Sequence, residues 1–306
     1  MTNKPIITVG ITAYKVSKYL NRALQSVINQ TSNQWRGVLI LDGGNDKKTK
    51  KIFKSFSHSN FIKHSLLDRQ GPYGTRNKAI ELCSTDWYYQ LDGDDMLPHN
   101  SIELILSKIE ENKNIEYIYG NCEHFSKKYS SIRKPSEDFE DLCFGPLFNA
   151  QSPIKKQTIL RFGGFSEELI INADWDFWLK VHREKIKGEY IDKIIYKRRD
   201  RENNVGNEMM LQRPAVVKNI IENHSWFFNI GDRKKKTMAT MYRKLAGFTK
   251  SIGDRKKSKF YAEKAIKNGS KSFLYKNIFR EAEMFYLRYK LRRIFRYFST
   301  FQNKYL

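Results

Sequence analysis

The sequence predicts an α/β protein with a mostly parallel sheet, helices on both faces of that sheet, and a helical C-terminal extension. Two observations lead to this fold class. Strand and helix patterns alternate up to about residue 120, and the strands are almost wholly apolar, as they are in sheets that helices cover on both faces. From about residue 209 onward the pattern is helical, and this segment forms the extension.

The alternating elements follow one another with short connections. Apolar runs predict strands at residues 6–11, 37–42, 61–67, 87–92 and 115–120. A first helix is expected after Ser17, a candidate N-cap, because Leu20, Leu24 and Ile28 recur at helical spacing. Further helices are expected around residues 74–83 and from Pro98 through Ile109.

The pattern weakens after residue 125. Prolines and mixed charge predict loops and short strands over residues 125–160, which could shape a second substrate pocket. A helix is expected over 172–185, followed by a basic stretch at 197–201 and a polar loop at 202–207. The later helices should be broken near 251–254 and 267–270. We therefore expect a domain at 1–208, with halves of about 1–120 and 121–208, and a basic helical region at 209–306.

Composition restricts the class of protein. The chain has 306 residues, of which 40% are hydrophobic, so it is globular and not disordered. Its longest apolar stretches fall far short of the ~20 residues needed to span a bilayer, and its first residues lack a signal-peptide apolar region. The three cysteines are widely separated and match no metal or redox spacing. A reducing cytoplasm is the expected compartment.

The net charge of +23 is unevenly distributed. Residues 231–306 hold 22 Lys+Arg and 5 Asp+Glu, a net of +17, whereas residues 1–230 hold 34 and 28, a net of +6. From Met284 to Phe298, apolar residues form one helical stripe with arginines around it. Such a helix either lies on an anionic membrane surface or packs on the main domain with a solvated basic back. Charge alone would also suit a nucleic-acid binder, but the acid cluster described next argues against one.

Three carboxylates, Asp92, Asp94 and Asp95, follow directly after the apolar strand that ends the stretch YYQLDGDDML. Tyr14 and Asp42 also follow predicted strands. Open α/β sheets bind ligands beyond the carboxyl ends of their strands, so these residues can converge on one crevice. Carboxylates suit Mg²⁺ or Mn²⁺. An acidic turn that caps the helix beginning near Pro98 is the alternative.

Four blocks of sequence resemble glycosyltransferase family 2, the inverting nucleotide-sugar transferases with the GT-A fold, a Rossmann-type arrangement. The resemblance covers roughly residues 5–200. The blocks are VGITAYKVSKYLNRALQSVINQT, LILDGGNDKKT, GPYGTRNKAIELCSTDWYYQLDGDDMLP and GGFSEELIINADWDFWLKV. The second block has the Asp-Gly-Gly form found in one branch of the family.

The resemblance implies roles for individual residues. Those that would bind the nucleotide sugar are Thr12, Tyr14, Asp42, Arg76, Asp92 and Asp94. Asp94 and Asp95 would bind a divalent metal, Mn²⁺ or Mg²⁺. Asp174, the acid before Trp175, would be the catalytic base. Asp176 lies two residues further along the same predicted helix, and its side chain should diverge from that of Asp174 by roughly 200°.

The sequence departs from the family pattern at several positions. Gly43 stands where most of the family has a second Asp, so uridine is not implied as the nucleoside, and Ala173 replaces the usual Glu. Arg199 falls roughly where many relatives have a His near the metal. The basic residues 197–199 either neutralise phosphate or form a solvated loop. Trp175 and Trp178 are expected to pack in the core, the alternative being to stack on a sugar.

The expected function is a metal-dependent inverting transfer of a sugar from a nucleotide sugar to a hydroxyl of a glycan or lipid-linked acceptor. Bacterial surface polysaccharide synthesis is the expected setting, in the cytoplasm or peripherally on the inner face of the cell membrane. A homologue that binds nucleotide sugar without turnover is the main alternative, and a nucleic-acid binder is a weaker one. No nucleic acid is expected as a partner.

Overall fold

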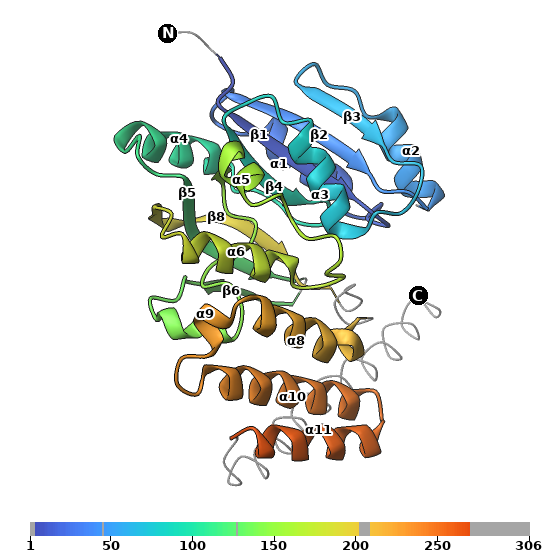
Figure 1. Ribbon diagram of the computed structural model, residues 1–306. Coiled ribbons are helices and arrows are strands. Elements are labelled where there is room, and N and C mark those ends of the chain that lie inside the picture. The colour runs from blue at the N-terminus through green and yellow to red at the C-terminus, as the bar shows by residue number, and fades with distance from the viewer. Residues whose placement is uncertain (1–3, 45, 127, 202–208, 270–306) are drawn as a thin grey trace. The chain divides into compact units, whose positions relative to one another are not determined.

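The structure is a computed structural model that describes residues 4–44, 46–126, 128–201 and 209–269 (Figure 1). The chain divides into two compact units, Met1–Asn204 and Val205–Leu306, which are described separately below. Within the described residues, no helix combines the length and the apolar character that crossing a membrane would require.

The first unit is built on an eight-stranded sheet. Its first part contains β1 (Ile7–Ala13), β2 (Trp35–Leu41), β3 (Phe61–Ser65) and β4 (Trp87–Asp92), which lie in the order β3-β2-β1-β4 and are all parallel. All four strands were predicted from apolar runs. Except in β3, nearly every residue of these strands is buried, as expected for a sheet that is covered on both faces.

The second part of the sheet has mixed direction. The two-residue strand β7 (Ile154–Lys155) pairs antiparallel with both β4 and β5 (Tyr117–Phe125), so β4 and β5 run the same way. β5 also pairs antiparallel with β6 (Ser130–Arg133) and parallel with β8 (Gly188–Arg199). Strand β8 was not predicted from the sequence, because its charged residues interrupt the apolar pattern on the face that is not buried.

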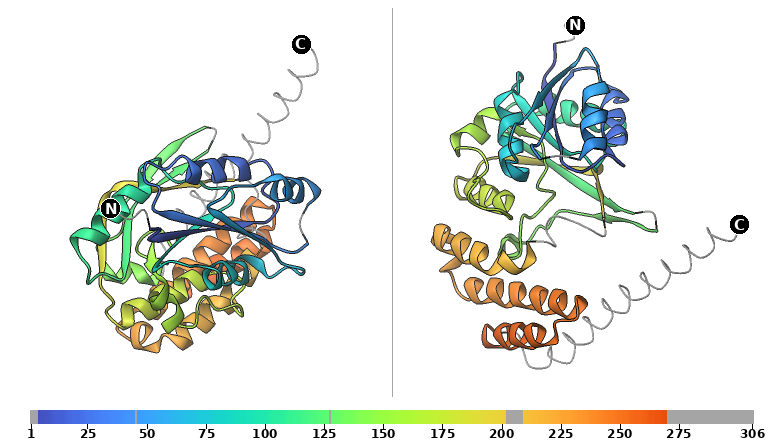
Figure 2. Two further views of the ribbon diagram at one scale, coloured as in Figure 1. Left: turned by 90° about the horizontal axis from the view of Figure 1, so that it is seen from above. Right: turned by 90° about the vertical axis from the view of Figure 1, so that its right-hand side faces the viewer.

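Helices cover both faces of the sheet. Figure 2 shows α1 (Leu20–Ile28) and α2 (Lys47–Ser55) on one face, and α3 (Gly71–Glu81) and α6 (Ala173–Arg183) on the opposite face. Side-chain hydrogen bonds of Gln30 join the end of α1 to the start of α4 (Ser101–Glu111). The predicted N-cap at Ser17 was wrong: a turn over Val16–Leu20 precedes α1, which begins at Leu20 without a side-chain cap.

The region 125–160 has loops and short strands, as predicted, and two short helices that were not. These are η1 (Phe139–Cys143) and α5 (Lys156–Arg161). Helix α6 packs its aromatic residues into the core beside this region. Trp175 and Trp178 are 3% and 1% exposed, and their indole N–H groups donate to the carbonyls of Leu142 and Ala150. Both rings therefore belong to the core and are not available to stack on a sugar.

The second unit is helical, as the sequence predicts. It contains η2 (Met210–Gln212), α8 (Arg213–Asn223), α9 (Ser225–Phe228), α10 (Arg233–Ser251) and α11 (Arg255–Lys267). The break predicted near 251–254 separates α10 from α11, which pack together through Ala246, Ala262 and Tyr261. The amphipathic stripe Met284–Phe298 lies outside the described residues.

Candidate active site

The carboxyl ends of the parallel strands bring the predicted residues to one edge of the sheet. Thr12 and Asp92 are paired in the register of β1 and β4, and the Gln90 side chain donates to the Thr12 hydroxyl at 3.2 Å. The turn after β4 crosses closely over β1. A Cβ on Gly93 would lie 2.6 Å from the Thr12 carbonyl oxygen, so this turn requires glycine, and the Gly93 N–H donates to that oxygen.

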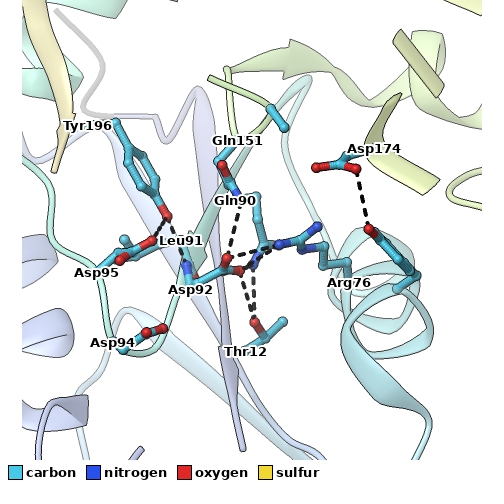
Figure 3. A network of polar contacts seen from close by, with 12 residues as sticks. Thr12, Arg76, Gln90, Leu91, Asp92, Asp94, Asp95, Gln151, Asp174 and Tyr196 are labelled. Carbon is cyan, nitrogen blue, oxygen red and sulfur yellow. Dashed lines mark hydrogen bonds and ion pairs between the residues drawn. The ribbon is translucent and has the colours of Figure 1, made fainter. Parts of the chain in front are cut away.

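Asp92 is the centre of a hydrogen-bonded network (Figure 3). Arg76 on α3 contacts both of its carboxylate oxygens, at 3.0 and 2.9 Å. Gln90 and Gln151 each donate to it at 3.1 Å. Burial favours the neutral acid, but the charge and hydrogen bonds of Arg76, with that of Gln90, outweigh burial and hold the pKa of Asp92 below its usual range.

Asp95 and Asp94 have different surroundings from Asp92. Asp95 accepts the Tyr196 hydroxyl at 2.9 Å and the Arg199 backbone N–H at 2.7 Å. Burial, and then the charges of Asp94 and Asp92, raise the pKa of Asp95 well above its usual value. Asp94 forms an ion pair with Arg201 over 2.5 Å. Burial also raises the pKa of Asp94, against the opposing charge of Arg201.

Asp174 reaches the site from α6. It accepts the hydroxyl of Tyr73 at 3.3 Å, and Tyr73 packs its ring against the Arg76 guanidinium, 5.4 Å from the ring centroid. The charges of Asp92, Tyr73 and Asp174 outweigh burial and raise the pKa of Arg76. Arg76 therefore lies between the carboxylates of Asp92 and Asp174, which come from different elements (Figure 3).

Asp176 has a different ion-pair partner from the residues of this cluster. It is 2% exposed, and it forms an ion pair with Lys180 one turn along α6, at 2.8 Å. Asp174 is less deeply buried and contacts Tyr73 instead. Of the two aspartates that the sequence analysis compared, Asp174 is the one at the site.

The residues predicted to contact the nucleotide lie beside β2. Asp42 is buried, and its carboxylate accepts the backbone N–H groups of Gly43, Gln70 and Gly71 at 3.0, 2.8 and 3.2 Å, so it also anchors the loop before α3. The Tyr14 ring has the Arg69 guanidinium 4.5 Å from its centroid.

Gly43 has no room for a side chain. A Cβ there would lie 2.1 Å from the Asp68 carbonyl carbon, which is far inside van der Waals contact. The backbone of the 68–71 loop fills the space into which a side chain at residue 43 would point. The departure at Gly43 thus has a steric cause.

The basic residues 197–199 belong to strand β8, so the interpretation of this stretch as a solvated loop was wrong. Lys197 pairs with Glu123 at 2.9 Å. Arg199 donates its Nε–H to the carbonyl of Asp94 at 2.8 Å. Arg198 is exposed at the end of β8, and although partial desolvation lowers its pKa, the charges of Asp95 and Asp92 outweigh this and raise it. The positive charge at the end of β8 therefore lies close enough to the acid cluster to favour ionised carboxylates.

Five contributors to the site were not predicted from the sequence. They are Tyr73, Gln90, Gln151, Tyr196 and Arg201. Arg201 lay in the basic stretch that was noticed, but nothing in the sequence assigned it to Asp94. Gln151 is a single polar residue in a region with a weak pattern, and no local signal could have identified it.

The ligand set of the site suits a hard cation only when the substrate supplies ligands too. Among the described residues, no group of three or more His, Cys, Asp or Glu side chains is gathered as a metal cluster. Asp92 and Asp95 have both carboxylate oxygens occupied by protein donors. Asp94 is the acid that can offer an oxygen. Mg²⁺ sites often combine one or two carboxylates with substrate phosphates and water, and this arrangement fits that pattern.

The fold and the site define a class: an α/β domain of the GT-A type with aspartates at the carboxyl edge of a mostly parallel sheet. The chain belongs to glycosyl transferase family 2, whose model matches residues 8–166, and this makes it a glycosyltransferase. An uncharacterised glycosyltransferase of Methanocaldococcus jannaschii is 26% identical over 209 residues, 64% of this chain and 71% of that protein. Chondroitin synthase of Escherichia coli is 24% identical over 63% of this chain but only 29% of its own length.

Two solved structures share the fold. TarS of S. aureus in complex with UDP-GlcNAc has a TM-score of 0.57 at 13% identity, covering 84% of this chain and 90% of that one. The mannosyltransferase PcManGT from Pyrobaculum calidifontis, in complex with GDP-Man and Mn²⁺, has a TM-score of 0.56 at 12% identity, covering 94% and 83%.

Proposed function

We propose that the protein transfers a sugar from a nucleotide-sugar donor to a hydroxyl group of a glycan or lipid-linked acceptor, with inversion at the anomeric carbon. The observation that carries this proposal is the position of Arg76 between two carboxylates. Asp92 faces it from the end of β4, and Asp174 faces it from the first turn of α6. In this proposal the donor would bind on the Asp92 side of this buried cation, and Asp174 would accept a proton on the other side.

The donor would bind along the edge formed by β1, β2 and β4. Thr12, Tyr14 and Asp42 line the part of this edge assigned to the base and ribose. Arg76 and Asp92 are held rigidly by each other and by Gln90 and Gln151, so they keep one geometry when the donor arrives. Such preorganisation lowers the cost of orienting the diphosphate for departure.

Asp174 would act as general base. In the transfer, a bond forms between the acceptor oxygen and the anomeric carbon while the bond from that carbon to the diphosphate oxygen breaks. The electron pair leaves with the diphosphate, and the hydroxyl proton passes to the Asp174 carboxylate. The Tyr73 hydroxyl holds one Asp174 oxygen, which leaves the second oxygen to face the acceptor.

We also propose that activity requires a divalent cation, Mn²⁺ or Mg²⁺, held by Asp94 with Asp95 behind it. When bound, the cation would neutralise charge on the departing diphosphate as a Lewis acid. Asp95 would act chiefly by fixing the turn, since its oxygens are committed to Tyr196 and the Arg199 backbone.

The setting is proposed from the relatives and from charge. A chondroitin synthase among the relatives favours polysaccharide synthesis, with a lipid-linked or glycan acceptor bound by residues of about 121–208. The basic region 209–306 would attach the protein peripherally to the inner, cytoplasmic face of an anionic membrane. Residues 209–269 alone hold 15 Lys+Arg and 4 Asp+Glu, and each basic residue near such a surface contributes about 1 kcal/mol of attraction.

The test is a panel of nucleotide sugars, followed by a turnover assay. Uridine, guanosine and thymidine diphosphate sugars are screened by thermal shift with and without Mn²⁺, because a ligand that binds only the folded state raises the Tm. The donor that binds is then assayed for hydrolysis and transfer. We expect one donor class to bind and to turn over, and Asp94→Asn to lose activity while its Tm without ligand stays within a few degrees.

Three results would count against parts of this proposal. If no nucleotide sugar raises the Tm, the donor assignment is wrong. Binding without hydrolysis or transfer would instead identify a homologue that has lost catalysis, which is the alternative that Ala173 favours. Full turnover in excess chelator would remove the cation requirement and leave the rest intact.

A further inference from the structure

Arg201 and Asp94 join the ends of two strands that are distant in sequence. Asp94 lies two residues after β4, and Arg201 lies two residues after β8. Their side chains are 12% and 21% exposed, and the Arg201 Nε atom is 2.5 Å from the Asp94 Oδ2 atom. The ion pair therefore lies at the acid cluster, largely shielded from water.

This ion pair lacks a hydrogen bond. The Nε–H of Arg201 is buried and has no hydrogen-bond partner, so it lies close to the carboxylate without being aimed at it. A buried donor that makes no hydrogen bond is destabilising, because it has lost water without gaining a partner. The attraction of opposite charges holds Arg201 to Asp94, but the two groups are not oriented for a hydrogen bond.

The other two acids of the cluster are held differently. Asp92 accepts well-formed hydrogen bonds from Arg76, Gln90 and Gln151. Asp95 accepts them from the Tyr196 hydroxyl and the Arg199 backbone N–H. Exchanging any of these partners would break aligned hydrogen bonds. Of the three carboxylates, Asp94 has the partner that is most easily exchanged.

We propose that Arg201 is an exchangeable counter-ion. It neutralises Asp94 in the ligand-free protein, and it moves to the diphosphate of the donor when a divalent cation takes the Asp94 carboxylate. This inference rests on the proposed function and deepens it. The exchange satisfies each group: the guanidinium, with several N–H donors in a planar fork, matches phosphate oxygens, and Asp94 keeps a cationic partner throughout.

The exchange makes cation binding and diphosphate binding depend on each other. A cation that arrives alone must displace Arg201 and leave its partly shielded guanidinium without an anion. When a nucleoside diphosphate is present, the displaced Arg201 has a new partner, and the cation binds more tightly. Such linkage is reciprocal and typically amounts to 5- to 150-fold in affinity.

The test measures Mn²⁺ binding directly. Free Mn²⁺ is titrated by electron paramagnetic resonance against the full chain, with and without UDP or GDP. For the wild type we expect weak Mn²⁺ binding that tightens at least about tenfold with the diphosphate that binds. Arg201→Gln should bind Mn²⁺ alone about tenfold more tightly than the wild type, and it should lose most of the dependence on the diphosphate.

Two further variants make the result specific. Arg161→Gln removes an arginine that pairs with Glu116 at 3.4 Å on the exposed side of α5, and it should behave as the wild type in every titration. Arg201→Lys keeps a positive charge for Asp94 but lacks the planar fork. It should therefore bind Mn²⁺ alone as weakly as the wild type and show reduced coupling to the diphosphate, provided that its far-ultraviolet circular dichroism is unchanged.

The outcomes separate this inference from the proposed function. If Arg201→Gln and the wild type have equal Mn²⁺ affinities with and without diphosphate, the exchange is wrong even when sugar transfer is observed. The same conclusion follows if the wild type binds no Mn²⁺ under either condition. If the predicted shifts appear but no acceptor is glycosylated, the exchange stands and the proposed transfer fails.

Discussion

Replacing Asp174 with asparagine keeps the shape of the side chain and removes its ability to accept a proton. The Tyr73 hydroxyl can still donate to the asparagine oxygen, so the local geometry at the start of α6 should survive. A positioned general base contributes roughly 10²- to 10⁴-fold to a rate, or about 3–5 kcal/mol of barrier. We expect Asp174→Asn to lower kcat by that factor while donor affinity is retained.

Asp176→Asn is the matched control, because it makes the same chemical change two residues away on the same helix. Asp176 is buried and pairs with Lys180, whose side chain is 34% exposed. Loss of this partly solvated pair should lower the free energy of unfolding by about 1–2 kcal/mol. The rate of transfer should change less than about threefold, since the ion pair of Asp176 is with Lys180 on the same helix.

The assay compares single-turnover transfer at saturating donor with urea unfolding of the same three proteins. Single turnover isolates the chemical step from product release. A variant that is slow but stable has lost chemistry, whereas one that is unstable but fast has lost packing. The base assignment is refuted if Asp174→Asn transfers sugar at the wild-type rate, or if Asp176→Asn is the inactive protein.

Three other predictions concern stability and membrane binding. Gly43→Ala places a Cβ 2.1 Å from the Asp68 carbonyl carbon. It should lower the free energy of unfolding of the first unit, measured in urea, by about 2 kcal/mol or more. Its control is Gly247→Ala in α10, which should be neutral or slightly stabilising because a Cβ there meets nothing within 4 Å. Burial lowers the pKa of His182 from 6.5 to about 4, so between these pH values the unfolded chain binds more protons than the folded chain. The wild type should therefore lose up to roughly 3 kcal/mol of stability as pH falls from 6.5 to 4, and His182→Leu should remove this loss. An unchanged pH dependence in the variant would contradict this prediction. The full chain should float with anionic vesicles and not with neutral ones at low salt, and equal recovery on both would argue against the membrane proposal.

The sequence was sufficient to predict the parallel half of the sheet and the position of Tyr14, Asp42 and Asp92 after the carboxyl ends of its strands. Apolar runs of four to seven residues that end on a polar residue are strong local signals. Because parallel strands all point the same way, their ends must lie on one side of the sheet. The family blocks then supplied Arg76 and Asp174, which come from helices and have no position fixed by that rule.

The partners of the acids could not be predicted in the same way. Arg201 lies far from Asp94 in sequence, and Gln151 lies 59 residues from Asp92, so neither pairing leaves a local pattern. Strand β8 was missed for a related reason. It is covered on one side only, and its exposed positions carry charges that mask the period-two alternation. Long-range charge pairing and one-sided burial are properties of the folded chain and not of any short segment.

The two-residue strand β7 links two parts of the sheet that are built from different lengths of the chain. Strands β1 to β4 find all their parallel neighbours within the first 92 residues, so this half of the sheet can form while the rest of the chain is still on the ribosome, where domains emerge at about 5–20 residues per second. β7 joins that half to β5 by a single pair, Tyr117 and Ile154, and β8 must then return to β5 from residue 188. Asp174, the proposed base, and Arg201 come from the later part of this unit, so the acidic edge after β4 and the groups that face it depend on different lengths of the chain.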